Sequence, residues 1–484
     1  MLNKYLWQLY LDSGGNNTVK MFEDNFTNGM KMEYADTVTE LHRHYLSANS
    51  IISDEHSQLK ALYEYLSEND GSPFGTNALE ELYDGIIEEL STDDAAFDDF
   101  SWSIAYYSTL LSYFYPETYI PYYFKFNYNI LEMISDTFCI DLPEMPKKSD
   151  HKGRFFFYDE LCCALHDFRK QNMLTPYEFF AFLYDLAPKY IGGVDSYIIK
   201  ELPEPKAAYF IGGSKDDAFL ADETDHIIPW QCNVDTKAGD MIVMYLRSPI
   251  SAIDSVWRSC SVGFNDPFFY FYHCSYISDP FYMNRISLND IKKDVKLAKM
   301  SIVRKNMQGV NGVEIKPSEY ARILKLGKCN APEIKYSSDI SDTTFCTEKD
   351  VEEKIIKPLL KQLGYSEKDY IQQLYIEIGN HNHALIPDFI LMPKKTGNGY
   401  KAFAIIEAKL SVTSEKQLND AKKQARSYAK LLSAKKLAVI SKEKIWVYGE
   451  KDDFDKCISE LEVIGLSDDD VYNLKRELTE RFHT

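Results

Sequence analysis

The chain has 484 residues, of which 45% are hydrophobic, 26% charged and 14% aromatic, a globular composition that excludes a disordered or collagen-like chain. No run approaches the roughly 18 apolar residues of a membrane-spanning helix, and the N-terminus lacks the cleavage site of a signal peptide. The nine cysteines form no CxxC pair, which argues against a disulfide framework and a zinc knuckle. We therefore expect a cytoplasmic protein with about two to four domains.

The net charge of −20 speaks against a nucleic-acid ligand when it is taken as a whole. The acidity is concentrated, however, because residues 1–200 hold 32 of the 74 acidic residues and only 14 of the 54 basic ones. The remainder is close to neutral and can present a basic groove locally. The overall charge therefore does not exclude a polyanionic partner for the later part of the chain.

Residues 1–200 are predicted to form an acidic, mostly helical domain. Leu59, Leu62, Tyr63 and Leu66 recur at helical spacing, and a second helical tract runs from Leu161 to Leu186. The sequence between these tracts is dense in Tyr and Phe, and a buried core explains it better than base stacking does. We expect this region to serve as a scaffold, an oligomerisation surface or a regulator, because its charge opposes phosphate binding.

Residues 206–325, after the linker sequence ELPEPK, are predicted to form a compact strand-rich domain. The runs AAYFIGG, DMIVMYL and PFFYFYHCSYI are β-branched and aromatic and are separated by turn residues, as in strands.

Residues 340–484 are predicted to form an α/β domain with a central sheet. The pattern predicts a helix over 350–363, strands over 371–378, 385–391 and 402–408, a helix over 415–432, and strands over 436–441 and 444–448.

The strongest chemical signal lies in the sequence IPDFILMPKKTGNGYKAFAIIEAKL. Asp388 begins one apolar strand, and Glu407 and Lys409 end the next strand on the same face, because residues two apart on a strand point the same way. Two carboxylates at strand ends suit Mg²⁺, and Mn²⁺ in its place, because these ions prefer oxygen ligands. A lysine beside the metal can orient or deprotonate a water and offset charge on a phosphate. Surface charges on an ordinary strand pair are the alternative interpretation.

The helix before the sheet offers one further carboxylate. Glu348 and Glu352 are four residues apart and therefore lie on one helix face. Either glutamate could reach the metal, and a solvated helix face explains each of them equally well.

These motifs, TEKDVEEKIIKPLLKQLGY, PDF, EAK and QARSYA within 346–448, resemble the PD-(D/E)XK nucleases, most closely the nuclease domain of type I restriction R subunits. The resemblance implies that Asp388, Glu407 and the carbonyl of Ala408 bind the metal and that Lys409 is catalytic. It also implies a catalytic role for Glu348 or Glu352, and for Gln424 in a Gln-x-x-x-Tyr element with Tyr428. R subunits couple this domain to a motor, but the sequence holds no GxxxxGK[ST] motif for ATP, so a motor would be a separate partner.

The middle domain resembles the EVE branch of the PUA-like fold, a small β-barrel that holds a modified or flipped base. The likeness lies in PWQCNVDTKAGDMIVMYL and in the closing sequence QGVNGVEIKPSEYARIL. It implies that Trp230 and Asn233, in a polar loop, lie near the base pocket. Trp257 and one side of a strand through FFYFYH (Phe268, Tyr270 and Tyr272, or the alternate set) would supply stacking walls, unless these aromatics fill the barrel core.

The sequence therefore predicts a modification-dependent, type IV-like restriction endonuclease of a prokaryote, which defends its host against phage. It would read a modified base in DNA, most simply a cytosine, and cut as a homo-oligomer without membrane contact. A nuclease of the same chemistry acting on RNA is one alternative. A reader of modified nucleic acid that does not cut is another, although the intact set of Asp388, Glu407 and Lys409 argues against it.

Overall fold

The structure, a computed structural model, describes residues 2–27, 104–105, 108–109, 111–112, 115–124, 126–193, 196–215, 217, 227–269, 271–278, 280–336, 344–377, 384–397 and 399–480. The chain divides into two compact units. The first unit contains residues 1–204, 209–314 and 326–331, and the second contains 205–208, 315–325 and 332–484. The predicted boundaries at 200, 206, 325 and 340 stay a prediction.

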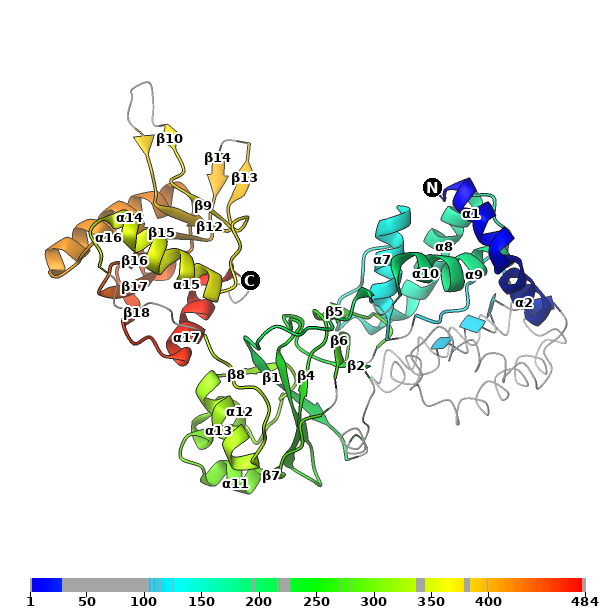
Figure 1. The fold of residues 1–484 in the computed structure, drawn as a ribbon, viewed down its shortest axis with the longest axis horizontal. Helices are drawn as coiled ribbons and strands as arrows, with labels where there is room; N and C mark the ends of the chain where they lie inside the picture. The colour runs from blue at the N-terminus through cyan, green and yellow to red at the C-terminus, as the bar shows by residue number, and fades with distance from the viewer. Residues whose placement is uncertain are drawn as a thin grey trace. The chain divides into compact units, whose positions relative to one another are not determined.

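The described residues before position 200 are helical in their regular elements (Figure 1). The helices are α1 (Lys4–Tyr10), η1 (Leu11–Gly15), α2 (Asn16–Thr27), α7 (Tyr128–Phe138), α8 (His151–Gln171), α9 (Pro176–Ala181), η2 (Phe182–Leu186) and α10 (Ala187–Ile191). The predicted apolar stripe from Leu59 to Leu66 lies outside the described residues. Among the residues that the structure describes, no helix is both long and apolar enough to cross a membrane.

The second predicted tract, Leu161 to Leu186, is two helical segments, and it begins earlier than the pattern indicated. Helix α8 starts at His151, because the Asp150 carboxylate accepts the backbone N–H of Gly153 and caps the first turn. A short break follows α8, and Thr175 and Glu178 form a capping box that starts α9. Polar capping residues therefore set these boundaries, and apolar spacing alone does not show them.

The aromatic tract of the first region is core, as predicted. Tyr122, Tyr123, Phe124 and Tyr128 are each at most 4% exposed and pack with the apolar faces of α7, α8 and α9. Phe268, from the strand-rich part of the same unit, joins this core, with its ring 4.5 Å from that of Tyr122. These four aromatic residues are therefore not free to stack on a nucleic-acid base.

The strand-rich part forms two β-sheets. One sheet has the order β7-β4-β3-β1-β8 and the other the order β2-β6-β5. The strands are β1 (Ala208–Gly213), β2 (Ile228–Gln231), β3 (Met241–Leu246), β4 (Ala252–Arg258), β5 (Phe264–Asn265), β6 (His273–Ile277), β7 (Ile286–Ser287) and β8 (Val313–Ile315). Isolated bridges, Val256 to Phe281 and Ser259 to Ile277, connect β4 with the region of β6. Over the residues described, the two sheets do not close into the predicted barrel.

The predicted strand through FFYFYH is wrong before His273. Phe268 and Phe269 lie in a turn because the Asp266 carboxylate accepts the N–H of Phe268 at 2.9 Å. The turn ends at Tyr272, directly before β6, and the φ of 70° at Tyr272 is incompatible with a regular strand. An Asp-Pro turn therefore overrides the β propensity of this aromatic run.

Long-range polar contacts hold this turn to the helical region. The Arg154 side chain, 1% exposed, donates to the carbonyls of Pro267 at 2.8 Å and Phe269 at 2.5 Å. The Tyr276 hydroxyl donates to the Asn127 carboxamide at 2.6 Å. The helical and strand-rich parts of the first unit thus share buried hydrogen bonds.

The second unit has a six-stranded sheet of order β18-β17-β16-β15-β12-β9 (Figure 1). Its strands and the two small ribbons are β9 (Tyr370–Gln372), β10 (Ile376–Glu377), β11 (Ala384–Leu385), β12 (Phe389–Leu391), β13 (Lys394–Thr396), β14 (Gly399–Lys401), β15 (Ala404–Ala408), β16 (Lys436–Ile440), β17 (Lys444–Gly449) and β18 (Cys457–Glu462). The predicted strands over 371–378 and 385–391 are each divided, because β10 and β11 form a separate ribbon.

The helices of this unit are α13 (Pro317–Gly327), α14 (Glu348–Val351), η6 (Glu352–Ile356), α15 (Lys357–Gln362), α16 (Glu415–Leu431), the short η7 (Glu450–Asp452) and α17 (Asp468–Leu478). The predicted helix over 350–363 begins two residues earlier, where Thr347 and Asp350 form a capping box. Ala421, Ala425 and Tyr428 of α16 pack on one face of the sheet with Ile405 and Val439. The second unit is therefore α/β, as predicted, with a mixed sheet.

Candidate active site

The register of two strands places Asp388 beside the end of β15. Strands β12 and β15 are antiparallel, and Phe389 is opposite Ile406. Asp388, just before β12, is therefore beside Glu407 and Ala408 at one end of the pair. Its carboxylate accepts the backbone N–H of Ala408 at 2.7 Å, which fixes the side chain there.

Lys409 follows β15 directly and turns back to Glu407. Its ammonium group donates to the Glu407 carboxylate at 2.7 Å, and its own backbone N–H donates to the Ile440 carbonyl at 2.9 Å. Glu407 lies two residues after Ile405 and opposite Val439 in the parallel ladder, so its side chain points to the face that α16 covers. The structure thus brings together the three residues that the sequence singled out.

The three groups share a buried electrostatic environment. Glu407 is 1% exposed, and burial, followed by the nearby Asp388 charge, raises its pKa to about 7. Burial also raises the pKa of Asp388, whereas the hydrogen bond from the Ala408 N–H and the charge of Lys409 act to lower it. Burial acts to lower the pKa of Lys409, but the hydrogen bond to Glu407 and the surrounding carboxylates outweigh it and raise that pKa. Lys409 is therefore a cation at neutral pH.

The two helical glutamates occupy different positions. Glu352 is 5% exposed and accepts a hydrogen bond from the Gln372 side chain at 2.6 Å. Glu348 is more exposed, and its carboxylate lies 3.8 Å from the Lys409 ammonium. Both glutamates act to raise the pKa of Asp388. Glu352 opens the π-helical turn η6, a helix type frequent at functional sites.

The site is chemically suited to a hard cation. One oxygen of Glu407, Oε2, is buried and has no hydrogen-bond partner among the residues that the structure describes, although it lies beside a second carboxylate. An unpaired buried carboxylate oxygen is costly unless a proton or a cation meets it. Within the described ranges, however, no group of three or more His, Cys, Asp or Glu side chains is arranged to hold a metal ion. Any metal here would take two carboxylates, with the Ala408 carbonyl and water completing its ligands.

The predicted Gln-x-x-x-Tyr element forms a pair on α16. Gln424 is exposed, and its side chain donates to the Tyr428 hydroxyl at 3.1 Å. Tyr428 is buried in the apolar cluster against the sheet. Gln424 therefore lies on the helix that covers the face to which Glu407 points, and Tyr428 orients it.

Two further residues were not found from the sequence. Gln372, on β9, orients Glu352 through the hydrogen bond given above. Glu443, between β16 and β17, accepts hydrogen bonds from Ser411 at 2.6 Å, from Ser441 at 2.7 Å and from the Val412 N–H at 3.2 Å. It thereby holds the loop that follows Lys409. No local motif marks either residue, because Gln372 acts on Glu352, 20 positions earlier, and Glu443 holds Ser411 and Val412, more than 30 positions earlier.

The predicted base-binding residues are less concentrated in space than Asp388, Glu407 and Lys409. Trp230 is on strand β2, not in a loop, and is partly buried. Within the described part of the chain, its buried indole N–H has no hydrogen-bond partner. Asn233 donates from its side chain to the Gly312 carbonyl at 2.7 Å and accepts from the Asp235 N–H. Trp257 is 1% exposed in the core and donates to Ser255, and Tyr270 lies outside the described residues. Phe268 is fully buried, and the Tyr272 hydroxyl donates to the Pro146 carbonyl.

No family model and no curated protein matches this sequence. Two solved structures align with about a quarter of the chain. One is the NMR structure of Rpa0253 from Rhodopseudomonas palustris, with 14% identity over 25% of this chain and 93% of that one and a TM-score of 0.23. The other is the crystal structure of Atu2648 from Agrobacterium tumefaciens, with 16% identity over 26% of this chain and 97% of that one and a TM-score of 0.23. Scores this low carry no argument about fold or function.

Proposed function

We propose that the second unit is a metal-dependent phosphodiesterase of the PD-(D/E)XK nuclease type. The observation that carries the proposal is the buried Glu407 Oε2, which has no hydrogen-bond partner among the described residues and lies beside Asp388 and a cationic lysine. A structural ion pair would satisfy its own oxygens, whereas this arrangement leaves excess negative charge for a cation.

The residues would divide the work as follows. Asp388, Glu407 and the Ala408 carbonyl would hold Mg²⁺ or Mn²⁺, which when bound supplies Lewis-acid stabilisation of a phosphate oxygen. Lys409 is protonated in the cation-free arrangement, so it is better suited to stabilising charge on the reacting phosphate and orienting water than to removing a proton.

Three other side chains would complete this site. Glu352, fixed by Gln372, faces Asp388, and Glu348 faces Lys409. Gln424 would contact substrate or water from α16.

The proposed substrate is DNA that carries a modified base, and the proposed biological role is restriction of phage by a homo-oligomer, with any motor supplied by a partner. Two features support a base reader in the first unit. The buried indole N–H of Trp230 meets no acceptor among the described residues, and its side chain is only partly buried. The sequence likeness to EVE and PUA-like domains adds to this support. Such a domain would select the target, and the carboxylate site would cut it.

Cleavage by the full chain tests the proposal. The protein is incubated with Mg²⁺ and unmodified DNA, cytosine-modified DNA or structured RNA, and the products are compared with a chelator control. We expect modified DNA to be cut, and Asp388→Asn and Glu407→Gln to lose at least about a hundredfold in rate. Glu462→Gln, an exposed change on strand β18 of the same sheet, is the matched control. Full activity in Glu407→Gln would remove the nuclease assignment, and cutting of RNA alone would replace the substrate.

A further inference from the structure

Residues 288–305, here called the basic segment, depart from the acidic character of the chain. They contain six Lys or Arg residues and two Asp residues, a local excess of four positive charges in a protein of net charge −20. The segment comprises α11 (Leu288–Lys293), η5 (Leu297–Lys299) and α12 (Ser301–Arg304), and Figure 1 shows α11 beside β7.

Burial of the apolar residues turns these charges outward. Ile291, Leu297, Ile302 and Val303 are each at most 5% exposed and anchor the segment on its inner side. All six basic residues are exposed: Lys292, Lys293, Lys296, Lys299, Arg304 and Lys305. The segment therefore presents a row of cations to solvent.

Most of these cations are not neutralised by neighbours. Lys293 lies 3.9 Å from Asp290, and Lys292 donates to the Asn306 side chain at 2.6 Å. In the part of the chain that the structure describes, Lys296, Lys299, Arg304 and Lys305 form no ion pair. A row of unpaired cations in an acidic protein raises the local concentration of a polyanion.

The end of the segment adjoins the residues that the sequence predicts to read a base. The turn that follows Lys305 contains Asn311, whose side chain accepts the Gly212 N–H at 2.5 Å. In the same turn, the Gly312 carbonyl accepts from the Asn233 side chain at 2.7 Å. Asn233 is three residues from Trp230, so the turn that follows the segment connects it to the candidate reading residues within the first unit.

We propose that the basic segment binds the phosphate backbone of a DNA duplex and holds it against the Trp230–Asn233 region. The inference deepens the proposed function, because it rests on DNA as the ligand, but it does not depend on cleavage. Lysines contact phosphates without reading sequence, which would leave selection to the neighbouring pocket. A membrane surface is less suitable, since three short helical pieces do not make the continuous amphipathic helix that lies on a bilayer.

The test is binding of the full chain to a labelled duplex, without divalent cation, over a series of salt concentrations. The variant Lys296→Glu/Lys299→Glu/Lys305→Glu should lose roughly ten- to a thousandfold in affinity. Its salt slope should fall by about 3, because each lost phosphate contact removes about 0.9 from that slope. The ratio between modified and unmodified duplexes should be unchanged. Lys147→Glu/Lys152→Glu/Lys170→Glu, equally exposed in the helical region, gives the same charge change and should keep more of the affinity and the full slope.

The outcomes separate this inference from the nuclease proposal. Salt-dependent binding that needs the segment, in a protein that cuts nothing, would support the segment and remove the nuclease. An unchanged slope in the segment variant, or an equal loss in the control triple, would overturn the inference. Segment-dependent binding to phosphatidylserine vesicles without duplex binding would also overturn it. The neutral triple Lys296→Gln/Lys299→Gln/Lys305→Gln, checked by thermal melting, guards against misfolding of the charge-reversed protein.

Discussion

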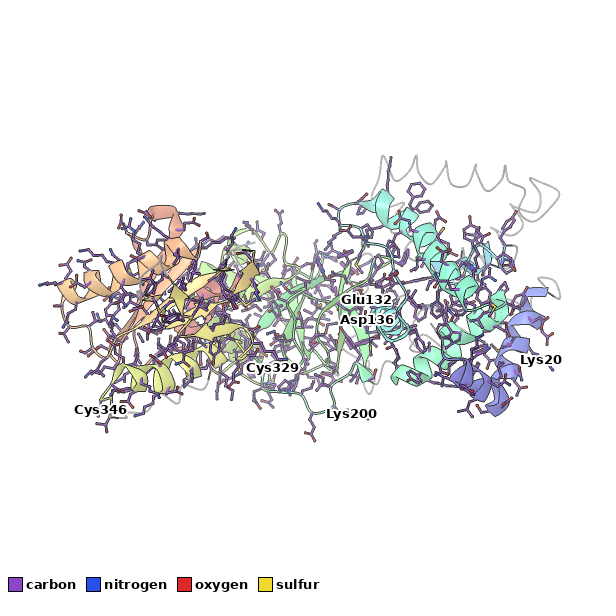
Figure 2. The ribbon with its side chains drawn as sticks, turned by 90° about the horizontal axis from the view of Figure 1, so that it is seen from above. Lys20, Glu132, Asp136, Lys200, Cys329 and Cys346 are labelled. Atoms are coloured by element: carbon purple, nitrogen blue, oxygen red, sulfur yellow. The ribbon has the colours of Figure 1, made fainter. Side chains whose placement is uncertain are left out.

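Glu407 and Glu132 both have a pKa of about 7, but they belong to different regions of the molecule. Burial is the main cause for each. For Glu407 the next cause is the Asp388 charge, and Lys409 opposes the rise in pKa. For Glu132 on α7 the further causes are the charges of Asp266 and Asp136. Figure 2 labels Glu132 and Asp136 next to each other. A raised pKa therefore does not identify a site by itself. The combination of two carboxylates with a lysine at hydrogen-bonding distance distinguishes the second unit.

The regions also differ in how their polar groups are assembled. Asp388 directly precedes β12 and Glu407 lies on the neighbouring strand β15, so strand register alone brings them together. In the first unit, the turn at Pro267 depends on Arg154, 113 positions earlier in the sequence. Local motifs can therefore reveal the first kind of arrangement and not the second.

The largest effect expected is on catalysis. Lys409→Ala should lower the cleavage rate by about a hundredfold or more, because it removes the cation at the reacting phosphate. Lys401→Ala, on the exposed ribbon strand β14, is the matched control and should retain activity. Single-turnover rates with equal protein stability are the measurement. Activity near the wild-type level in Lys409→Ala would mean that Lys409 and Glu407 form an ordinary structural ion pair and not a catalytic site.

The next prediction concerns the folding free energy of the first unit, and the expected loss is of a size comparable to the catalytic one. Arg154→Ala should destabilise this unit by about 2–4 kcal/mol, because it leaves buried carbonyls without a charged donor. Denaturant unfolding, followed by hydrogen exchange in each unit, measures the change. Protection of β15 and β16 should be unaffected, and a loss there would show that the two units do not unfold independently.

The base-reading region should respond more moderately. Trp230→Ala should lower affinity for modified duplex by roughly ten- to a hundredfold, since stacking contributes about 1–3 kcal/mol per base. Affinity for unmodified duplex should hardly change. Trp257→Phe is the comparison, because Trp257 is core and should affect melting temperature without changing the preference. If Trp230→Ala alters only stability, Trp230 also belongs to the core.

The smallest effect separates the two glutamates by their response to metal. A carboxyl whose folded pKa exceeds its unfolded value binds extra protons in the folded state, so stability falls as pH rises from about 4.5 to about 7. Glu407→Gln and Glu132→Gln should each flatten this dependence in melting experiments. Mg²⁺ should restore stability above pH 7 through Glu407 only, with apparent Mg²⁺ affinity rising about tenfold per pH unit below 7. An equal response in Glu407→Gln would exclude that residue as a ligand.

The sequence was sufficient for much of the second unit because its elements are short, regular and adjacent. The continuous apolar run AFAII indicated β15, and the two-residue period of a strand gave the shared face of Glu407 and Lys409. Capping residues agree with the start of α16 at Glu415. The strand through FFYFYH failed because the β propensity of its aromatic residues was given more weight than the turn signal of Asp266 and Pro267, where the Asp266 carboxylate stabilises a turn. Gln372 and Glu443 could not be found because their roles exist only after distant strands have paired.

The π-helical turn η6 has an evolutionary and engineering consequence. A π turn amounts to one inserted residue, which rotates everything after it by about 100° relative to an uninterrupted helix. Glu348 and Glu352 precede that rotation, whereas Leu359 and Leu360, which pack in the core, follow it. The insertion thus lets the chemical face and the packing face of one helix be adjusted separately. A single-codon deletion within residues 353–356 would couple the two faces again. The helix could then not bury its leucines and keep its glutamates at the site at the same time.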